Sequence, residues 1–150
     1  MRNDTFVVAP TMKHTSHITV ALVDDHKIFR QGLIEVLNHL GYTVAIEASN
    51  GRELLEKLEN RDLPTICILD IHMPEMDGFE TTRQLSSKYP GIKILAFSTD
   101  NTDVSVSKVI SCGAHGFLEK GGSLEDISGS LTAILDGSSD QPRAGTKHPV

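Results

Sequence analysis

A continuous apolar segment that ends in a single acid constrains this chain more than any other feature. Residues 66–69 are Ile, Cys, Ile and Leu, and they are followed by Asp70 and by a loop that contains Pro74 and Gly78. Because the apolar side chains stand at consecutive positions, the segment predicts a strand covered on both faces, as in a parallel sheet. An acid at the carboxyl end of such a strand lies where open α/β sheets bind their ligands. Asp70 is therefore expected to be a metal ligand, a nucleophile or a general base.

The rest of the chain alternates short apolar segments with amphipathic ones. Strands are predicted at residues 18–23, 42–48, 65–69, 92–97 and 114–118, each rich in β-branched or other apolar residues. Helices are predicted at residues 26–40, 51–60, 79–89, 103–112 and 124–135. This alternation predicts an α/β fold with a mostly parallel sheet and helices on both faces. The helix at 103–112 is expected to be weak, because valines and serines form helices poorly.

Helix ends are also readable from the sequence. Asp25 is a plausible N-cap for the first helix, and Ile28 belongs to the apolar face predicted for it. Ser123 is followed three residues later by Asp126, which predicts a capping box with Asp in place of Glu. Leu124 begins the apolar stripe predicted for the last helix.

The chain is long enough for one domain, and its ends differ from its middle. Residues 18–136 are predicted to form the domain, residues 1–17 a mobile N-terminal extension, and residues 137–150 a linker or C-terminal tail. Cys67 and Cys112 fit no metal or redox spacing, and we expect both to be buried small hydrophobic residues.

The charge balance and the apolar segments limit the expected partners. The formal net charge is −6 and no basic block is visible, so direct nucleic-acid binding by this chain alone is not expected. No apolar segment approaches the roughly 20 residues that span a bilayer, and the first residues lack the apolar core of a signal peptide. A cytoplasmic protein without membrane contact is the expectation.

Four polar residues each follow a predicted strand. They are Asp25, Asp70, Ser98 and Lys120, separated by 45, 28 and 22 residues. One strand–helix unit takes about 20–30 residues, so these separations correspond to two units, one unit and one unit. Right-handed crossovers place the carboxyl ends of parallel strands at one edge. The four side chains are therefore expected to meet there.

The chemistry of this set indicates metal-assisted phosphoryl transfer. Three carboxylates, on Asp24, Asp25 and Asp70, would repel one another unless a cation lay between them. Oxygen ligands in an incomplete shell suit Mg²⁺, which shares its coordination with water and phosphate oxygens. Lys120 supplies a positive charge and Ser98 a hydroxyl donor, both suited to a phosphoryl group. Asp70 can itself be the nucleophile, since carboxylates form aspartyl-phosphates.

Other residues near these positions have simpler interpretations. Phe117, at the end of the fifth predicted strand, is expected to be a core aromatic residue. His72 and His115 are expected to be loop or surface histidines, and Met73 and Met76 to pack around the loop after Asp70.

Taken together, these motifs resemble the receiver domain of bacterial two-component response regulators. The resemblance covers residues 18–136 and is closest to receivers that precede a LuxR/NarL-type helix-turn-helix domain. The motifs that carry it are Val23-Asp24-Asp25-His26, Phe29-Arg30-Gln31-Gly32-Leu33, the segment from Asp70 to Gly78, Ser98, and the segment from Gly113 to Lys120. The fold it implies is flavodoxin-like, a (βα)5 doubly wound parallel sheet with strand order 2-1-3-4-5 and three α/β/α layers.

The resemblance implies a role for each site residue. Asp70 would be the phosphoacceptor, taking its phosphoryl group from a sensor histidine kinase or a histidine phosphotransfer protein. Asp25, Asp70 and the main-chain carbonyl of His72 would bind Mg²⁺ or Mn²⁺, with Asp24 acting directly or through water. Lys120 would pair with the phosphoryl oxygens or, before phosphorylation, with Asp70.

The resemblance also implies a switch with a readout on one face. Ser98 would move toward the phosphoryl group and Phe117 would swing inward behind it. The face formed by the helix at 103–112, the strand at 114–118 and the helix at 124–135 would then engage a partner, and phosphorylation would promote a homodimer there. Transcription would be controlled through an output domain absent from this chain.

The sequence departs from the receiver pattern in three ways and leaves alternatives open. Phe117 stands where many members have Tyr, and Gly121 follows Lys120 where many have Pro. No output domain follows residue 136, so the chain is expected to be either a stand-alone receiver acting by protein–protein contact or part of a longer regulator. One rival is a Mg²⁺-dependent aspartyl-nucleophile phosphatase, although His72 stands where such enzymes carry a second acid. A nucleotide-binding module is the other, although strand one ends in two acids instead of a glycine-rich loop.

Overall fold

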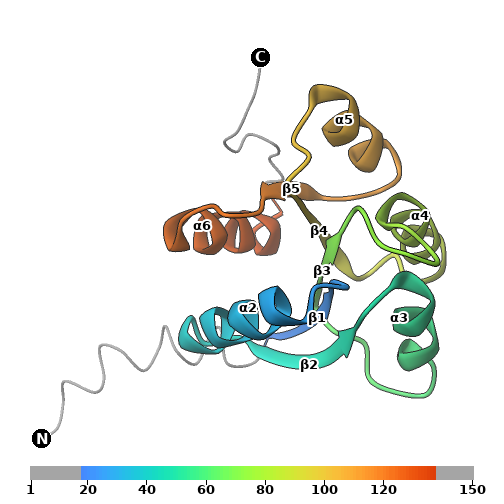
Figure 1. Cartoon of the computed structure of the whole chain (residues 1–150). Coiled ribbons are helices and arrows are strands. Elements are labelled where there is room, and N and C mark those ends of the chain that lie inside the picture. The colour runs from blue at the N-terminus through green and yellow to red at the C-terminus, as the bar shows by residue number, and fades with distance from the viewer. Residues whose placement is uncertain (1–17, 138–150) are drawn as a thin grey trace, which may run out of the picture.

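A computed structural model of the chain describes residues 18–137, in which five strands alternate with five helices. The predicted extension at 1–17 and all but the first residue of the predicted tail at 137–150 lie outside the described part. The elements, with the labels of Figure 1, are β1 (Thr19–Val23), α2 (Lys27–His39), β2 (Thr43–Ala48), α3 (Gly51–Leu58), β3 (Ile66–Asp70), α4 (Gly78–Lys88), β4 (Lys93–Ser98), α5 (Asp103–Ser111), β5 (Gly116–Glu119) and α6 (Leu124–Leu135).

The strands form one parallel sheet in the order β2-β1-β3-β4-β5, which confirms the predicted fold class and strand order. Helices α2 and α6 cover one face, and α3, α4 and α5 cover the other, so the molecule has three layers (Figure 1). Because every strand runs in the same direction, the loops that follow β1, β3, β4 and β5 gather at one edge of the sheet.

Two apolar cores, one on each face, hold the helices to the sheet. Successive residues of β3 alternate between them: Ile66 and Ile68 pack on the side of α2 and α6, and Cys67 and Leu69 on the side of the other three helices. All five residues of β3 are buried, as the unbroken apolar segment predicts. Cys67 and Cys112 are buried free thiols, as expected.

The start of the first helix differs from its prediction. His26, and not Asp25, occupies the N-cap position of α2, and its side chain makes no capping hydrogen bond. Ile28, predicted to be on the buried face, is 89% exposed. Because an α-helix has 3.6 residues per turn, Ile28 lies on the side of α2 opposite the buried Leu37. Asp25, which does not cap the helix, lies with the other acids at the edge of the sheet.

The last helix begins with the predicted capping box. The Ser123 hydroxyl accepts the N–H of Asp126 at 3.1 Å, and the Asp126 carboxylate accepts the N–H of Ser123 at 3.1 Å. Leu124 was predicted to be buried, but it is 43% exposed. Helix α5 buries a single residue, Val109, and leaves Val104 exposed. Its low stability stays a prediction.

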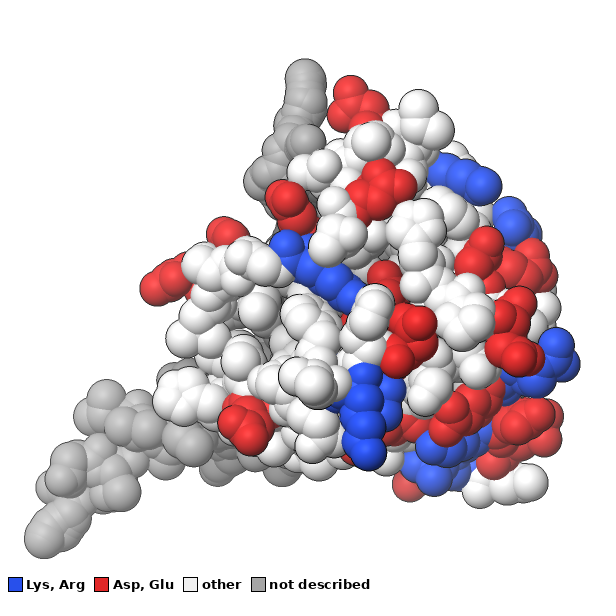
Figure 2. Space-filling view, in the orientation of Figure 1, with Lys and Arg blue, Asp and Glu red and all other residues white. Residues whose placement is uncertain are grey.

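The surface carries mixed charge, and the helices are too short to be membrane spans. On the face shown in Figure 2, Lys and Arg side chains lie among Asp and Glu side chains instead of forming one basic stretch. None of the helices between residues 18 and 137 combines the length and apolar character needed to cross a bilayer.

His115 is a half-buried residue of the loop before β5, as the sequence suggests, and it also accepts a structural hydrogen bond. Its Nδ1 accepts the backbone N–H of Ile94 at 3.0 Å, at the start of β4. Burial of the ring, together with the nearby charge of Lys93, lowers the pKa of His115 below its ordinary value of 6.5. The neutral ring is therefore the form that the fold requires.

We expect this histidine to weaken the protein in mild acid. Because the folded-state pKa is lowered, its contribution is fully present above the unfolded value of 6.5 and is lost as pH falls toward the folded value. The free energy of unfolding, measured by urea titration at several pH values between about 7.5 and 5.5, should fall more steeply for the parent chain than for His115→Gln. Parallel profiles for the two chains would contradict this.

Candidate functional site

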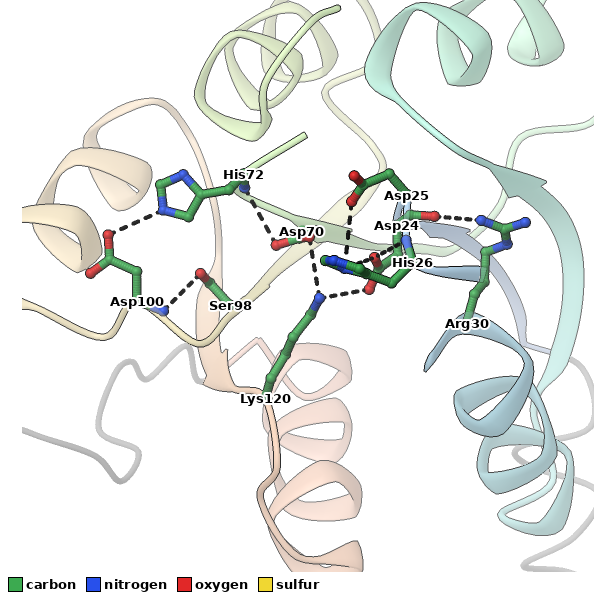
Figure 3. A network of polar contacts seen from close by, with 9 residues as sticks. All are labelled: Asp24, Asp25, His26, Arg30, Asp70, His72, Ser98, Asp100 and Lys120. Carbon is green, nitrogen blue, oxygen red and sulfur yellow. Dashed lines mark hydrogen bonds and ion pairs between the residues drawn. The ribbon is translucent and has the colours of Figure 1, made fainter. Parts of the chain in front are cut away.

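Acidic side chains and one lysine converge at the carboxyl edge of the sheet (Figure 3). Asp24 and Asp25 follow β1, Asp70 is the last residue of β3, and Lys120 follows β5. Asp24 is 1% exposed and Asp70 4% exposed, so both carboxylates are almost fully withdrawn from water. Carboxylates this deeply buried require compensation by a positive charge or by hydrogen bonds.

The acids lie close enough to share one cation. Ligand atoms of Asp24, Asp25, His26 and Asp70 all lie within 4.8 Å of one another. The backbone N–H of His26 donates to Asp24 Oδ1 at 2.8 Å, which orients that carboxylate. The His26 ring lies beside the acids, with Nδ1 3.3 Å from Asp24 Oδ1 and 3.6 Å from Asp25 Oδ1.

Arg30 fastens the loop that carries the first two acids. Its guanidinium donates to the main-chain oxygen of Asp24, and its Nε donates to Glu47 Oε1 at 3.1 Å (Figure 3 shows the first of these contacts). Asp24 N–H also donates to Ala48 O at 3.0 Å. The turn after β1 is thus tied both to α2 and to the end of β2. Sequence reasoning assigned no role to Arg30, although it lies one helical turn after His26 and could have been expected to reach back.

Lys120 closes the acidic cluster. Its Nζ lies 2.9 Å from Asp24 Oδ2 and 3.2 Å from Asp70 Oδ2, and its side chain is 9% exposed. The backbone N–H of Lys120 donates to Ser98 O at 2.9 Å, which fixes the β5–α6 loop against the end of β4. One ammonium therefore contacts two of the three clustered carboxylates, and net negative charge remains in the pocket.

The electrostatics of Asp70 reflect this incomplete compensation. Burial is the largest effect and raises the pKa of Asp70 above its ordinary value of 3.8; the neighbouring Asp24 also raises it, while Lys120 opposes both. Because the folded-state pKa is raised, any stability from the protonated form is present at low pH and is lost as pH rises through that value. At neutral pH the ionised Asp70 therefore destabilises the folded protein.

We expect Asp70→Asn to stabilise the protein in the absence of divalent cations. The amide keeps the shape of the side chain and removes one of the buried negative charges, while Lys120 retains Asp24 as a partner. Thermal unfolding with a chelator should give a Tm about 2–5 °C above that of the parent chain. A lower Tm for the variant would contradict this account.

Ser98 lies at the same edge but is engaged with the next loop. Its side chain is fully buried, and its hydroxyl oxygen accepts the N–H of Asp100 at 3.0 Å. Asp100 in turn lies 3.1 Å from His72 Nε2 and accepts the Ser105 hydroxyl at 2.8 Å. Hydrogen bonds from Ser105, the Thr102 backbone and His72 lower the pKa of Asp100 to about 2. The loops after β3 and β4 are therefore joined through one carboxylate.

Two further predicted site residues lie nearby. Phe117 is 5% exposed and packs in the core beneath α3, α4 and α5, as expected for a core aromatic residue. The backbone N–H of His72 approaches Asp70 Oδ1 at 3.4 Å, so the main chain at His72 borders the acidic cluster. The metal-binding role of its carbonyl stays a prediction.

A doubly wound sheet with three acids and a lysine at its carboxyl edge defines a class of α/β proteins suited to binding a cation and a phosphoryl group. Comparison with known families narrows the class: residues 20–132 match the family model described as response regulator receiver domain. The chain therefore belongs to the response regulator receiver family, as its motifs predicted.

Individual relatives are similar in sequence and in structure. The chain is 32% identical to the nitrate/nitrite response regulator protein NarL of Escherichia coli K12, over 93% of this chain and 71% of that protein. It is 33% identical to the transcriptional regulatory protein DegU of Brevibacillus brevis, over 69% of this chain but 44% of DegU. A LuxR-family two-component response regulator from Aurantimonas sp. SI85-9A1 superposes with a TM-score of 0.75 at 28% identity, covering 79% of this chain and 85% of that one. The chain thus spans about half the length of DegU.

Proposed function

We propose that this chain is a phosphorylation-dependent switch of a two-component system. Asp70 accepts a phosphoryl group from a phosphohistidine of a sensor histidine kinase or a histidine phosphotransfer protein. The observation that carries the proposal is the Asp70 carboxylate, 4% exposed, held 3.2 Å from Lys120 among two further acids. A carboxylate in that setting has a nucleophilic oxygen and a positive charge placed beside it.

The donor set of the pocket fits a hard divalent cation. Asp24, Asp25 and Asp70 offer carboxylate oxygens within 4.8 Å of one another, and a single ammonium leaves them under-compensated. Asp25, Asp70 and the main-chain carbonyl of His72 would hold Mg²⁺ or Mn²⁺, with Asp24 as a direct or water-mediated ligand. When bound, the cation would neutralise charge between these carboxylates and the incoming phosphoryl oxygens.

The chain's own residues carry the transfer. An ionised Asp70 oxygen forms the new bond to phosphorus as the bond from phosphorus to the donor's imidazole nitrogen breaks, and the imidazole keeps that electron pair and takes a proton. Lys120 then pairs with a phosphoryl oxygen beside Asp70. The Ser98 hydroxyl turns from the Asp100 N–H and donates to another phosphoryl oxygen.

The readout would follow from that movement of Ser98. Asp100, which now holds Ser98, also holds Ser105 in the first turn of α5, so release of Ser98 disturbs the start of that helix. Phe117 is already buried, so its change on phosphorylation would be a repacking beneath α5. The surface formed by α5, β5 and α6 would then change shape, which is a local charge event acting on a two-state element.

The test is intact-mass analysis after incubation with acetyl phosphate and Mg²⁺. One phosphoryl group per chain, slowly lost through the chain's own hydrolysis, is the expected result. Continued release of inorganic phosphate from varied phosphomonoesters, with no stable adduct, would instead favour an aspartyl-nucleophile phosphatase. That alternative has the weaker support, because His72 occupies the position of the second acid.

We further infer that the phosphorylated chain pairs with a second copy through the α5–β5–α6 surface. Exposed apolar side chains of α5, Val104 at 76% and Ile110 at 36%, suit such a contact. Light scattering should report a monomer before phosphorylation and a dimer after it, and Val104→Glu should prevent the dimer. An unchanged monomer mass after full phosphorylation would refute the pairing.

The remaining proposals concern the location of the protein and its output. We propose a cytoplasmic protein whose output is the control of transcription, exerted through a DNA-binding region outside residues 18–137 and not by direct nucleic-acid contact of this domain. A receiver acting by protein–protein contact alone is the other arrangement that the sequence allows.

A further inference from the structure

The ammonium of Lys120 lies over the ring of Phe29, a residue of α2 that is remote from it in sequence. Nζ stands 4.6 Å from the ring centroid, in addition to its contacts with Asp24 and Asp70. An ammonium has three N–H donors; one donates to Asp70 Oδ2, and the contact with Asp24 Oδ2 is an ion pair. The face of the ring meets the remaining positive surface, and such a contact strengthens when water is excluded, as it is around a side chain 9% exposed.

The ring of Phe29 is itself held by the sheet. It packs against Phe97 with centroids 5.4 Å apart and an interplanar angle of 42°. Phe97 is 2% exposed and directly precedes Ser98 in β4. Arg30, the next residue of α2, anchors the same helical turn to the main chain of Asp24. The ring is thus held by its contact with Phe97, and its helical turn is held by Arg30.

We propose that Phe29 is a positioning residue for phosphoryl transfer: its ring holds the Lys120 ammonium between Asp24 and Asp70. This inference rests on the proposed function, and it adds the residue that keeps the lysine's charge beside the phosphoacceptor. Without the ring, water replaces it at the ammonium, and Lys120 is drawn to Asp24, already the nearer carboxylate at 2.9 Å. The charge is then less often beside Asp70, where negative charge accumulates as phosphorus is transferred.

Substitution of Phe29 by leucine and by tyrosine distinguishes the effect of the aromatic face from the effect of side-chain size. Phe29→Leu keeps an apolar side chain against Phe97 but removes the aromatic face, whereas Phe29→Tyr keeps the face. With acetyl phosphate and Mg²⁺, we expect Phe29→Leu to take up the phosphoryl group about tenfold more slowly than the parent chain, and Phe29→Tyr to stay within about twofold of it. The control is Lys108→Met, which removes the ammonium that lies 4.2 Å over the Phe79 ring; its rate should match the parent.

A spectroscopic measurement reports the contact without any phosphoryl transfer. A ring face shifts nearby protons upfield, so the NMR signals of the Lys120 ε-methylene should be displaced in the parent chain and in Phe29→Tyr. They should return toward ordinary lysine values in Phe29→Leu, with loss of the nuclear Overhauser effect to the ring. Circular dichroism and thermal unfolding establish that each variant is folded.

The outcomes distinguish this inference from the function on which it rests. A parental rate in Phe29→Leu, or equal slowing in Phe29→Leu and Phe29→Tyr, overturns the role of the ring and leaves the function standing. If Phe29→Leu does not fold, the spectrum of the parent chain decides the question. The inference is overturned if the parent shows neither ring-shifted Lys120 signals nor a nuclear Overhauser effect to the ring. If the parent chain itself takes up no phosphoryl group, the proposed function fails and the positioning role fails with it, even where the ring contact is seen.

Discussion

Asp70→Asn is expected to abolish the uptake of a phosphoryl group by this chain. The amide carries no charge and is a poor nucleophile, so it cannot form the bond to phosphorus that the carboxylate forms. Asp24 and Asp25 are not expected to substitute, because Asp24 is already paired with Lys120 at 2.9 Å and both acids follow β1, so neither takes the position of Asp70 at the end of β3. Intact mass after incubation with acetyl phosphate and Mg²⁺ should show one added group on the parent chain and none on the variant.

Two controls make this result specific to the site. Asp62→Asn makes the same chemical change on an exposed residue before β3 and should retain full phosphorylation. Removal of divalent cations with a chelator should suppress phosphorylation of the parent chain, and Mg²⁺ or Mn²⁺ should restore it. Because Asp70→Asn is expected to be at least as stable as the parent, unfolding would not explain its loss. Undiminished phosphorylation of Asp70→Asn would remove Asp70 from its proposed role.

The fold was predictable because it follows from local sequence patterns and from the connectivity rules of parallel sheets. The unbroken apolar segment at residues 66–69 indicated a strand buried on both faces, and the alternation of strands and helices indicated a parallel sheet. Spacing then brought Asp25, Asp70 and Lys120 to one edge, since each follows a strand and all strands run the same way. These inferences require no knowledge of side-chain packing.

The parts of the site that escaped prediction depend on contacts between distant elements. Phe29 meets Lys120 only because α2 and the β5–α6 loop lie at the same end of the sheet, and nothing near either residue signals the contact. His115 pairs with a backbone N–H of the neighbouring strand, which is a matter of register between β4 and β5. Ile28 is a different case: it was assigned to the apolar face of α2, but the 3.6-residue period places it on the side opposite the buried Leu37.

Gly78→Ala is expected to destabilise the protein strongly, because the start of α4 packs directly on the backbone that ends β3. A Cβ at this position would lie 2.4 Å from Asp70 O and 2.5 Å from the Cα of Ile71. The Gly78 N–H also donates to Ile71 O at 2.6 Å, so the helix and the strand end cannot separate without losing that bond. Both colliding atoms are backbone, and no side-chain rotation can relieve the overlap. Urea unfolding should show a loss of about 3 kcal/mol.

Gly32→Ala is the matched control, since it places the same methyl group in the exposed interior of α2, where no atom lies within 4 Å. It should raise the free energy of unfolding by about 0.5–1 kcal/mol, because alanine has less conformational freedom to lose than glycine. If the free energy of unfolding of Gly78→Ala is instead within about 0.5 kcal/mol of the parent value, α4 does not approach the end of β3 as closely as described. That approach matters for function as well as for stability. The overlapping atoms belong to Asp70 and to the residue after it, so relief of the overlap must shift the main chain that presents the phosphoacceptor to Lys120.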